Sequence, residues 1–393
     1  MNKPSLNPEK FFVHSDIDQA ESLPPEAFES HDLLIHENKT LFANAWLMLP
    51  ETPRDAFLED PRSTTQRVEE PGSHAPLELD GRPLFLKRDG VGKLRLFPNV
   101  CTHAWYPLVT EAGKSKGVVC GQHGRRFDDE GQFVSQPAFG KLPNFPRPCD
   151  HLQELPLHQF GPWLFASLGK PVDDFETIFE PIRESIKHFQ IETWSRKLQK
   201  VEERVVPGNW KQHAWNFMDK FHIPFIHRGP KGLVDALYYR NYQTELYTGA
   251  SLQWAYAKNP DHGFDPELLP ERFRDPKDPS KRVFSLWWFI FPNLTLNFYP
   301  WGLSINRYEP VANHPDQTRF FWHHYVMDEK KYGEMESIWL NQQVDDEDVE
   351  AMDLVAKGIA SGFGVKGRFA PEEEKGPHWF HREVFKHLFP DHA

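Results

Sequence analysis

Residues 101–123 read CTHAWYPLVTEAGKSKGVVCGQH, a stretch that carries most of the chain's cysteines. It opens with Cys101 and His103 around one residue and closes with Cys120 and His123 around two. Two such loops facing each other can hold a metal centre between two thiolates and two imidazoles. Because two of the chain's three cysteines fall here, an inert cysteine beside unrelated histidines is a poor explanation. A structural zinc site with two Cys and two His is the next alternative.

The spacing resembles the Rieske motif, in which Cys-x-His and Cys-x-x-His are separated by about fifteen to seventeen residues. In this chain sixteen residues separate the two pairs. One departure is Ala104-Trp105, which stands where the family often has a basic residue and a glycine. This departure changes the surroundings of the cluster and removes no ligand. The resemblance implies a Rieske-type [2Fe-2S] cluster with its thiolates on one iron and its imidazoles on the other, held by Cys101, His103, Cys120 and His123.

A second group of candidate ligands follows about a hundred residues later in the chain. Residues 209–222 read NWKQHAWNFMDKFH, and His227 comes five residues after His222. We expect a helix over 209–222 that ends because of Pro224, so that His227 can return to the same point as His222. Two imidazoles so placed lack only a carboxylate to form a facial triad for Fe(II). From the spacing alone, two unrelated core or surface histidines are the better explanation.

The third ligand should be a carboxylate on the late helical stretch predicted over 331–359. On a helical wheel of about 100° per residue, Asp348 falls in the middle of an apolar stripe formed by Val344, Met352, Val355 and Ile359. An acid centred on a buried face is costly unless it is paired or binds a metal. The pattern therefore selects Asp348, with Asp345 at the edge of the stripe as the alternative. It predicts a solvated face for the run Asp345–Glu347.

Together these motifs resemble the α subunits of Rieske non-haem iron oxygenases over about residues 44–359. The resembling segments are Asn-Trp-Lys, Asn-Phe-x-Asp-x-Phe-His-x4-His and Glu-Asp-Val, in the order that the family has them. The resemblance implies a mononuclear Fe(II) held by His222, His227 and Asp348. It also implies that Asp219 acts in catalysis, by joining His222 to His123 of a neighbouring chain in a homotrimer. Local sequence alone would make Asp219 a helix-surface acid.

The resemblance implies the terminal oxygenase component of a multi-protein system. A separate NAD(P)H-dependent reductase, with or without a ferredoxin, supplies electrons, and O₂ supplies one or both of the oxygen atoms inserted. The substrate is a small organic molecule, oxidised on an aromatic ring or at a carbon next to a quaternary ammonium group. The Asn-Phe-x-Asp-x-Phe-His spacing and the Glu-Asp-Val helix look somewhat closer to the choline-monooxygenase-like branch of the family. No Gly-x-Gly-x-x-Gly follows a predicted strand, so we expect no NAD or flavin site in this chain.

The alternatives from another class are a Rieske-type electron carrier and a zinc-stabilised binding protein without oxygenase activity. The second set of ligands argues against a pure carrier, which needs no second metal. Composition and charge also disfavour other classes of protein. The chain has 393 residues and a formal net charge of −12, which disfavours nucleic-acid binding. It has no apolar run long enough to span a bilayer, and its polar N-terminus predicts a cytoplasmic enzyme.

The predicted fold class is α+β, with a Rieske all-β domain inserted in a catalytic domain. Short apolar runs broken by glycine turns predict the β domain over residues 45–165. We expect residues 1–44 to form an arm on the catalytic domain, residues 166–393, whose antiparallel sheet and flanking helices the resemblance implies. Further predicted elements are a helix over 173–188, strands over 284–297, 303–308 and 319–326, and an exposed C-terminal helix with His378, His381 and His387. Aromatic candidates for a substrate pocket are Trp287, Trp288, Phe289, Phe291, Phe298, Tyr299 and Trp301.

Overall fold

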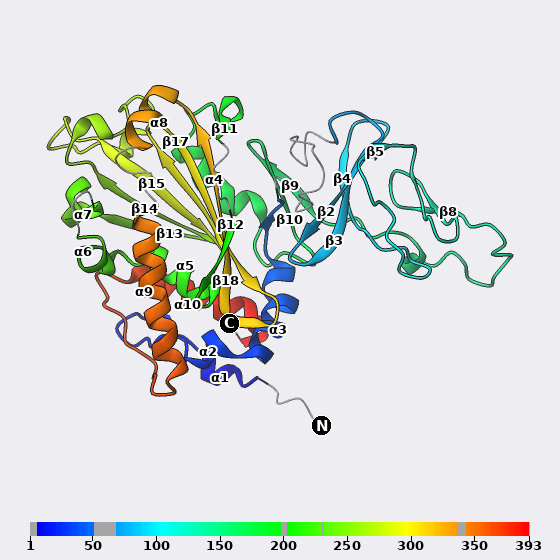
Figure 1. Cartoon of the computed structure of the whole chain (residues 1–393), viewed down its shortest axis with the longest axis horizontal. Helices are drawn as coiled ribbons and strands as arrows, with labels where there is room; N and C mark the ends of the chain where they lie inside the picture. Colours follow the sequence, from blue (N-terminus) through cyan, green and yellow to red (C-terminus); the bar gives the residue numbers. More distant parts are fainter. Residues whose placement is uncertain (1–5, 51–67, 198–202, 229–231, 337–342, 393) are drawn as a thin grey trace. The chain divides into compact units, whose positions relative to one another are not determined.

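The computed structural model describes residues 6–50, 68–197, 203–228, 232–336 and 343–392. The chain folds as two compact units (Figure 1). One unit is Ala43–Pro171, and the other combines Met1–Phe42 with Val172–Ala393. The first unit is built from strands, and the second is a large antiparallel sheet with helices. The predicted fold class, an all-β domain inserted in an α+β domain, is confirmed.

In its described residues, the unit Ala43–Pro171 consists of short strands in three antiparallel sheets. The sheet orders are β4-β3-β2-β5, β6-β7-β8 and β1-β10-β9. Cys101 and Cys120 are buried in its core, beside apolar residues such as Phe85, Phe97 and Phe127. The strands are β1 Leu47–Met48, β2 Ser73–Leu79, β3 Arg82–Arg88, β4 Leu94–Pro98, β5 Gly113–Lys114, β6 Val118–Val119, β7 Arg126–Phe127, β8 Phe133–Ser135, β9 Leu157–Phe160 and β10 Trp163–Ala166.

The second unit is organised by one antiparallel sheet in the order β11-β18-β17-β16-β15-β14-β13, with β12 also paired to β18. All eight residues of β15 are buried, as expected for a central strand that helices cover. The strands are β11 Ser195–Lys197, β12 Glu203–Pro207, β13 Gln243–Tyr247, β14 Ala250–Tyr256, β15 Val283–Ile290, β16 Leu294–Tyr299, β17 Gly302–Val311 and β18 His314–Val326.

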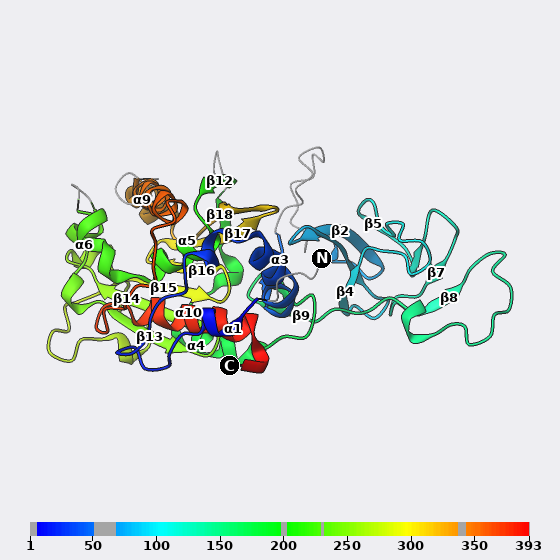
Figure 2. The ribbon, with the colours of Figure 1, turned by 90° about the horizontal axis from the view of Figure 1, so that it is seen from below.

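Helix α5 is the element that leads into the second group of candidate ligands. It contacts β17 and β18, and both α9 and α10 contact α5. In Figure 2, α5 lies between orange α9 and red α10. No helix of the described residues is long and apolar enough to cross a membrane. The helices are α1 Pro8–Phe11, α2 Glu26–Glu29, α3 His31–Thr40, α4 Phe175–Ser185, α5 Trp210–Met218, α6 Ile223–Ile226, α7 Leu233–Ala236, α8 Glu329–Glu336, α9 Gln343–Ala360 and α10 Lys375–Leu388.

The helix predicted over 209–222 is shorter in the structure. Helix α5 ends at Met218, and Asp219 has extended backbone angles, φ −88° and ψ 100°. The Asp219 side chain then caps a 3-10 turn, Lys220–His222, by accepting the N–H of Phe221 at 2.7 Å. Pro224 lies in the first turn of α6, where its missing N–H is not needed. It therefore begins a helix, and the prediction that it ends one was wrong.

Other predicted elements are confirmed in part. The helix over 173–188 is α4, and the strands over 303–308 and 319–326 lie within β17 and β18. The single strand over 284–297 is instead two, β15 and β16, because Pro292 has no N–H to give to a ladder. The helical stretch 331–359 is α8 and α9, with residues 337–342 outside the described part.

The prediction of an exposed C-terminal helix was wrong. Helix α10 is largely buried, and His378, His381 and His387 are all at most 7% exposed. Buried imidazoles need partners, and two of them find these in the N-terminal segment. His378 Nε2 lies 2.8 Å from the carbonyl of His14, and His381 Nδ1 accepts the N–H of Leu23 at 3.0 Å. Helix α10 therefore ties the two ends of the chain together within one unit.

Candidate metal centres

The two Cys-His loops of the β unit have matching backbone hydrogen bonds. The N–H of Cys101 donates to the carbonyl of Tyr106 at 2.9 Å, five residues later. The N–H of Cys120 donates to the carbonyl of Arg125 at 2.8 Å, also five residues later. Each loop therefore folds back on its own cysteine and holds the backbone of that cysteine in place. The spacing of residues in the sequence predicted both Cys-His pairs. It did not predict that the two loops would have the same backbone hydrogen bonds.

The matching pattern explains what Trp105 does to its loop. The carbonyl of Cys101 accepts the N–H of Trp105 at 3.1 Å, and that of Cys120 accepts the N–H of Gly124 at 3.0 Å. Both of these donors have left-handed backbone angles, φ 62° for Trp105 and φ 68° for Gly124. Glycine adopts this conformation freely, whereas a bulky residue is strained in it. The ligand loop therefore carries a strained tryptophan that is 81% exposed.

The four candidate cluster ligands form two pairs in different surroundings. Cys101 and Cys120 are buried in the same core cluster. Burial is the main reason why the pKa of Cys101 is raised. His103 and His123 are exposed, and their ring centroids lie 4.8 Å apart, edge to face. Two inner thiols and two outer imidazoles fit a cluster with thiolates on one iron and imidazoles on the other.

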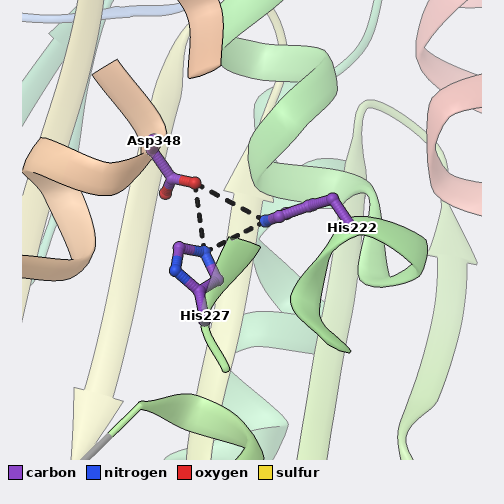
Figure 3. Close-up of side chains that lie close together, drawn as sticks. All are labelled: His222, His227 and Asp348. Carbon is purple, nitrogen blue, oxygen red and sulfur yellow. Dashed lines mark hydrogen bonds and ion pairs between the residues drawn. The ribbon is translucent and has the colours of Figure 1, made fainter. Parts of the chain in front are cut away.

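The other candidate centre is formed by His222, His227 and Asp348 (Figure 3). The Nε2 atoms of the two histidines are 3.1 Å apart. Asp348 Oδ1 lies 3.1 Å from Nε2 of His227 and 3.5 Å from Nε2 of His222. His227 is buried, and the other two residues are partly buried. The three ligand atoms thus point at one another from the turn before α6, the end of α6 and helix α9.

Helix α5 is anchored at the start of its sequence, which sets the position of the turn that follows. Asn209 caps the helix by accepting the N–H of Lys211 at 3.0 Å, and Gln212 returns a bond to the N–H of Asn209 at 2.6 Å. Lys211 Nζ lies 2.6 Å from Glu37 Oε1, and Trp210 donates to Glu37 Oε2 at 3.0 Å. Asn-Trp-Lys therefore holds the helix that delivers His222, and it does not itself reach the ligands.

Each imidazole of this group has a carboxylate behind it. His227 Nδ1 lies 2.8 Å from Glu347 Oε2, and His222 Nδ1 lies 3.5 Å from Asp219 Oδ2. The first distance is a hydrogen bond, and it favours the tautomer that leaves the Nε2 lone pair of His227 toward Asp348. The second is an ion-pair distance, and His222 Nδ1 has no hydrogen-bond partner among the described residues.

The acidic residues from Asp345 to Asp348 differ in burial and in the charges around them. Burial would raise the pKa of Asp348, but His227, His222 and Asn216 together bring it below its usual value. Burial, and then the charge of Asp348, raises the pKa of Asp345 to about 7. The predicted solvated face is therefore wrong for Asp345 and for Glu347. It is confirmed for Asp346, which is exposed and pairs with Arg204 at 2.7 Å.

The three ligand atoms fit a metal ion in geometry and in chemistry. With metal–ligand bonds of about 2.1 Å, neighbouring donors of an octahedral ion lie about 3.0 Å apart. The distances of 3.1, 3.1 and 3.5 Å are close to this value. Asp348 Oδ1 is also buried without a hydrogen bond among the described residues. Two imidazoles and one carboxylate are the donors of the facial triad that binds Fe(II) and leaves positions open.

A second cluster of possible ligand atoms needs no metal ion. Asp173, Glu383 and His387 have ligand atoms within 4.8 Å of one another in the described part of the chain. Lys386 Nζ lies 2.8 Å from Asp173 and 3.3 Å from Glu383. The ammonium group already supplies the positive charge that these carboxylates require.

The aromatic candidates divide between regions of the sheet. Trp287, Tyr299 and Trp301 pack with Ile223, the residue after His222. Trp287 Nε1 donates to the hydroxyl of Tyr299 at 3.1 Å, and the rings of Tyr299 and Trp301 stack at 4.7 Å. Trp288 instead donates to Ser185 at 3.1 Å, on α4. Trp287, Tyr299 and Trp301 therefore share a cluster with a neighbour of the candidate iron ligands.

Comparisons with known proteins identify both units. The family model described as "Ring hydroxylating alpha subunit (catalytic domain)" matches residues 189–388. The model described as "Rieske [2Fe-2S] domain" matches residues 62–146. Choline monooxygenase from Spinacia oleracea is 24% identical over 365 residues, which is 90% of this chain and 74% of the relative.

Two solved structures have the same fold along nearly the whole chain. A quaternary ammonium Rieske monooxygenase, studied for carnitine oxidation and inter-subunit electron transfer, superposes with a TM-score of 0.69. The two chains are 17% identical, and the match covers 98% of this chain and 99% of the other. Naphthalene 1,2-dioxygenase with bound indole superposes with a TM-score of 0.64 at 18% identity, covering 95% of this chain and 94% of the other.

Proposed function

This chain belongs to the family of ring-hydroxylating alpha subunits, and we propose that it oxidises a small quaternary ammonium compound at a carbon next to the nitrogen. It is the terminal oxygenase component of a Rieske non-haem iron system, with a [2Fe-2S] cluster and a mononuclear iron. Such alpha subunits work with a separate reductase or ferredoxin. When bound, the cluster supplies single electrons and the mononuclear iron supplies a site for O₂ chemistry.

One observation carries the oxygenase function, namely the group His222, His227 and Asp348. We assign these residues as the iron ligands, because three donors of the right kind converge to within 3.5 Å. We assign Cys101, His103, Cys120 and His123 as the cluster ligands because of their spacing in the sequence and the matching backbone hydrogen bonds of their two loops. Asp345 stays outside the iron ligand set, since no described ligand group includes it.

The residues around the iron ligands have supporting roles. Glu347 holds the ring of His227 and keeps a proton on Nδ1, so that Nε2 faces the centre. Asn216 is among the groups that bring the pKa of Asp348 below its usual value, after His227 and His222. Iron ligands that are oriented by neighbouring side chains in this way keep their geometry when substrate enters the site and water leaves it.

The substrate class is supported by the relatives and by the aromatic cluster near His222. The relatives' names include choline and a quaternary ammonium monooxygenase. Tyr242 stacks on Trp287 at 5.7 Å, and Tyr299 stacks on Trp301 at 4.7 Å. Aromatic faces attract quaternary ammonium cations, and the negative charge of Asp345 is, after burial, a further cause that raises the pKa of Tyr299. An arene would gain nothing from that charge.

The test is an oxygen-uptake screen with the purified chain and a surrogate reductase. Choline, carnitine and other quaternary amines are compared with arenes and aryl acids of similar size. We expect substrate-dependent uptake and a dealkylated or aldehyde product with at least one quaternary amine. Uptake and product formation with arenes alone would overturn the substrate class and leave the oxygenase assignment standing.

We also propose that the working form is a homotrimer in which Asp219 bridges His222 to His123 of a neighbouring chain. Support comes from Asp219 Oδ2, which lies 3.5 Å from His222 Nδ1, and from the inter-subunit electron transfer named for the solved relative. Asp219→Asn should keep the trimer and both metals but slow reoxidation of the reduced cluster in single-turnover stopped flow. A monomer by light scattering, or reoxidation at the wild-type rate, would contradict this arrangement.

A further inference from the structure

Arg125 is a fully buried arginine in the unit that carries the two ligand loops, with its side chain 2% exposed. Its guanidinium carbon lies 5.2, 5.3 and 5.5 Å from the ring centroids of Phe133, Phe139 and Phe145. Three aromatic faces therefore surround one cation, an arrangement that stabilises the charge while excluding water.

The charge of Arg125 is only partly offset by a carboxylate. The one described carboxylate within 4 Å is Asp150, whose Oδ1 is 3.8 Å from Nη1. Asp150 also lies 3.0 Å from Nε of Arg147, so two guanidinium groups share one negative charge. Burial excludes the water and salt that screen an exposed charge. Arg125 is therefore a buried cation whose carboxylate partner lies beyond hydrogen-bond distance and also pairs with Arg147, whose side chain is 63% exposed.

Arg125 is connected to both ligand loops. Its Nη1 donates to Thr102 Oγ1 at 2.8 Å, between Cys101 and His103 in the sequence. Its Nε donates to Gln136 Oε1 at 2.8 Å, and Gln136 Nε2 is 3.2 Å from Nδ1 of His103. Its own carbonyl accepts the N–H of Cys120 at 2.8 Å. The buried cation is thus fixed beside the candidate cluster ligands.

Holding the loops together does not by itself explain a buried charge. A guanidinium in a protein interior stays protonated and is costly to desolvate, and an apolar residue of similar volume is often as stabilising. A positive charge next to a redox centre has another consequence. It favours whichever state carries the additional electron, and it does so strongly where the local dielectric is low.

We propose that Arg125 is a potential-setting residue, whose buried positive charge favours the reduced cluster and so raises its reduction potential. The proposal rests on the cluster ligands assigned above. The step concerned is the addition of one electron, delivered by the separate reductase. In this step Arg125 forms no covalent bond and transfers no proton, and it affects the potential through its charge.

The experiment is a redox titration of the cluster in the purified full chain, followed by electron paramagnetic resonance. Arg125→Gln keeps a hydrogen-bond donor but removes the charge, and Arg125→Lys keeps the charge but loses the fork of donors. Arg126→Gln makes the same change at the exposed next residue and is the matched control.

Arg125→Gln should lower the ratio of reduced to oxidised cluster about tenfold at a fixed applied potential, which is about 59 mV for a one-electron couple. Arg125→Lys and Arg126→Gln should each stay within about twofold of the wild type, by the same charge argument. A wild-type potential in Arg125→Gln would overturn the proposal. So would an equal shift in Arg125→Lys and Arg125→Gln, since hydrogen bonding and not charge would then set the potential.

A variant that shifts the reduction potential in the opposite direction tests the proposal even where the Arg125 variants fail to fold. Asp150→Asn removes the partial counter-charge and should shift the potential upward, a direction that loosened packing does not explain. No shift or a downward shift in Asp150→Asn would overturn the proposal. A wild-type chain that assembles no cluster would instead refute the proposed function, so the two failures are distinguishable.

Discussion

The hydrogen bond from His227 to Glu347 makes a specific prediction about iron affinity. Glu347→Gln keeps an acceptor for Nδ1–H but removes the negative charge, at an atom 2.8 Å from a ring that is 1% exposed. Hydrogen bonds to charged groups contribute about 1.5–3 kcal/mol and neutral ones about 1 kcal/mol. The difference of about 1–2 kcal/mol corresponds to about 5- to 30-fold weaker iron binding. Glu347→Ala removes the bond altogether and should weaken iron binding about 10- to 100-fold.

The assay is competition for Fe(II) between the protein and a chelator, with the cluster absorbance as an internal measure of intact protein. Glu350→Gln makes the same substitution at an exposed position of α9 and is the control. The reasoning would be refuted if Glu347→Gln and Glu350→Gln bound iron equally well. It would also be refuted if the loss of iron in Glu347→Gln came with loss of the cluster absorbance.

Three further predictions concern stability. Lys211→Met leaves Glu37 buried without its ammonium partner and should lower the free energy of unfolding by about 3–5 kcal/mol. Lys10→Met removes an exposed ion pair and should lower it by at most about 1 kcal/mol. Equal urea midpoints for the two variants would contradict this. The pKa of His381 is lowered to about 3, mainly by burial. Below about pH 6.5 the unfolded chain therefore binds a proton at this residue that the folded chain does not bind. Because of this difference, the stability of the folded chain falls as the pH falls. Relative to His381→Asn, the wild type should lose about 2.3 kcal/mol between pH 6.5 and pH 4.5, and parallel stability profiles would rule this out. Trp105→Gly should be about 1 kcal/mol more stable than Trp105→Ala, because only glycine relieves the left-handed strain; thermal unfolding with Ala as stable as Gly would show that no strain exists.

Sequence reasoning succeeded where the signal is local. The two Cys-His pairs are short turns, so their spacing alone predicts that each pair shares one loop. The helical wheel of α9 singled out Asp348 because burial of a helix face follows from periodicity. The structure brings that residue to the two histidines at 3.1 and 3.5 Å.

Sequence reasoning failed where a contact depends on distant segments or on a cap. The break after Met218 comes from the Asp219 side chain, which caps the next turn, whereas Pro224 was the more visible signal. The buried state of His381 depends on Leu23, 358 positions away. Glu347 reads as one acid of a solvated run, and only the path of the chain brings it to His227.

The residue after a recognised motif can also be missed. Arg125 follows His123-Gly124 and reads as one of two adjacent surface arginines, yet only Arg126 is exposed. The signal available was the three phenylalanines at 133, 139 and 145, whose spacing of six residues suggests neither a helix nor a strand. Their convergence on one guanidinium is a property of the loop fold.

We propose that a [2Fe-2S] cluster and a separate mononuclear iron are held by different residues of this one chain. Iron and acid-labile sulfide analysis of the purified wild type and of Asp348→Ala tests it most directly. We predict about three iron atoms for every two sulfides in the wild type. In Asp348→Ala we predict about two iron atoms with unchanged sulfide and cluster absorbance. Zinc without sulfide in the wild type, or a third iron retained in Asp348→Ala, would contradict the account.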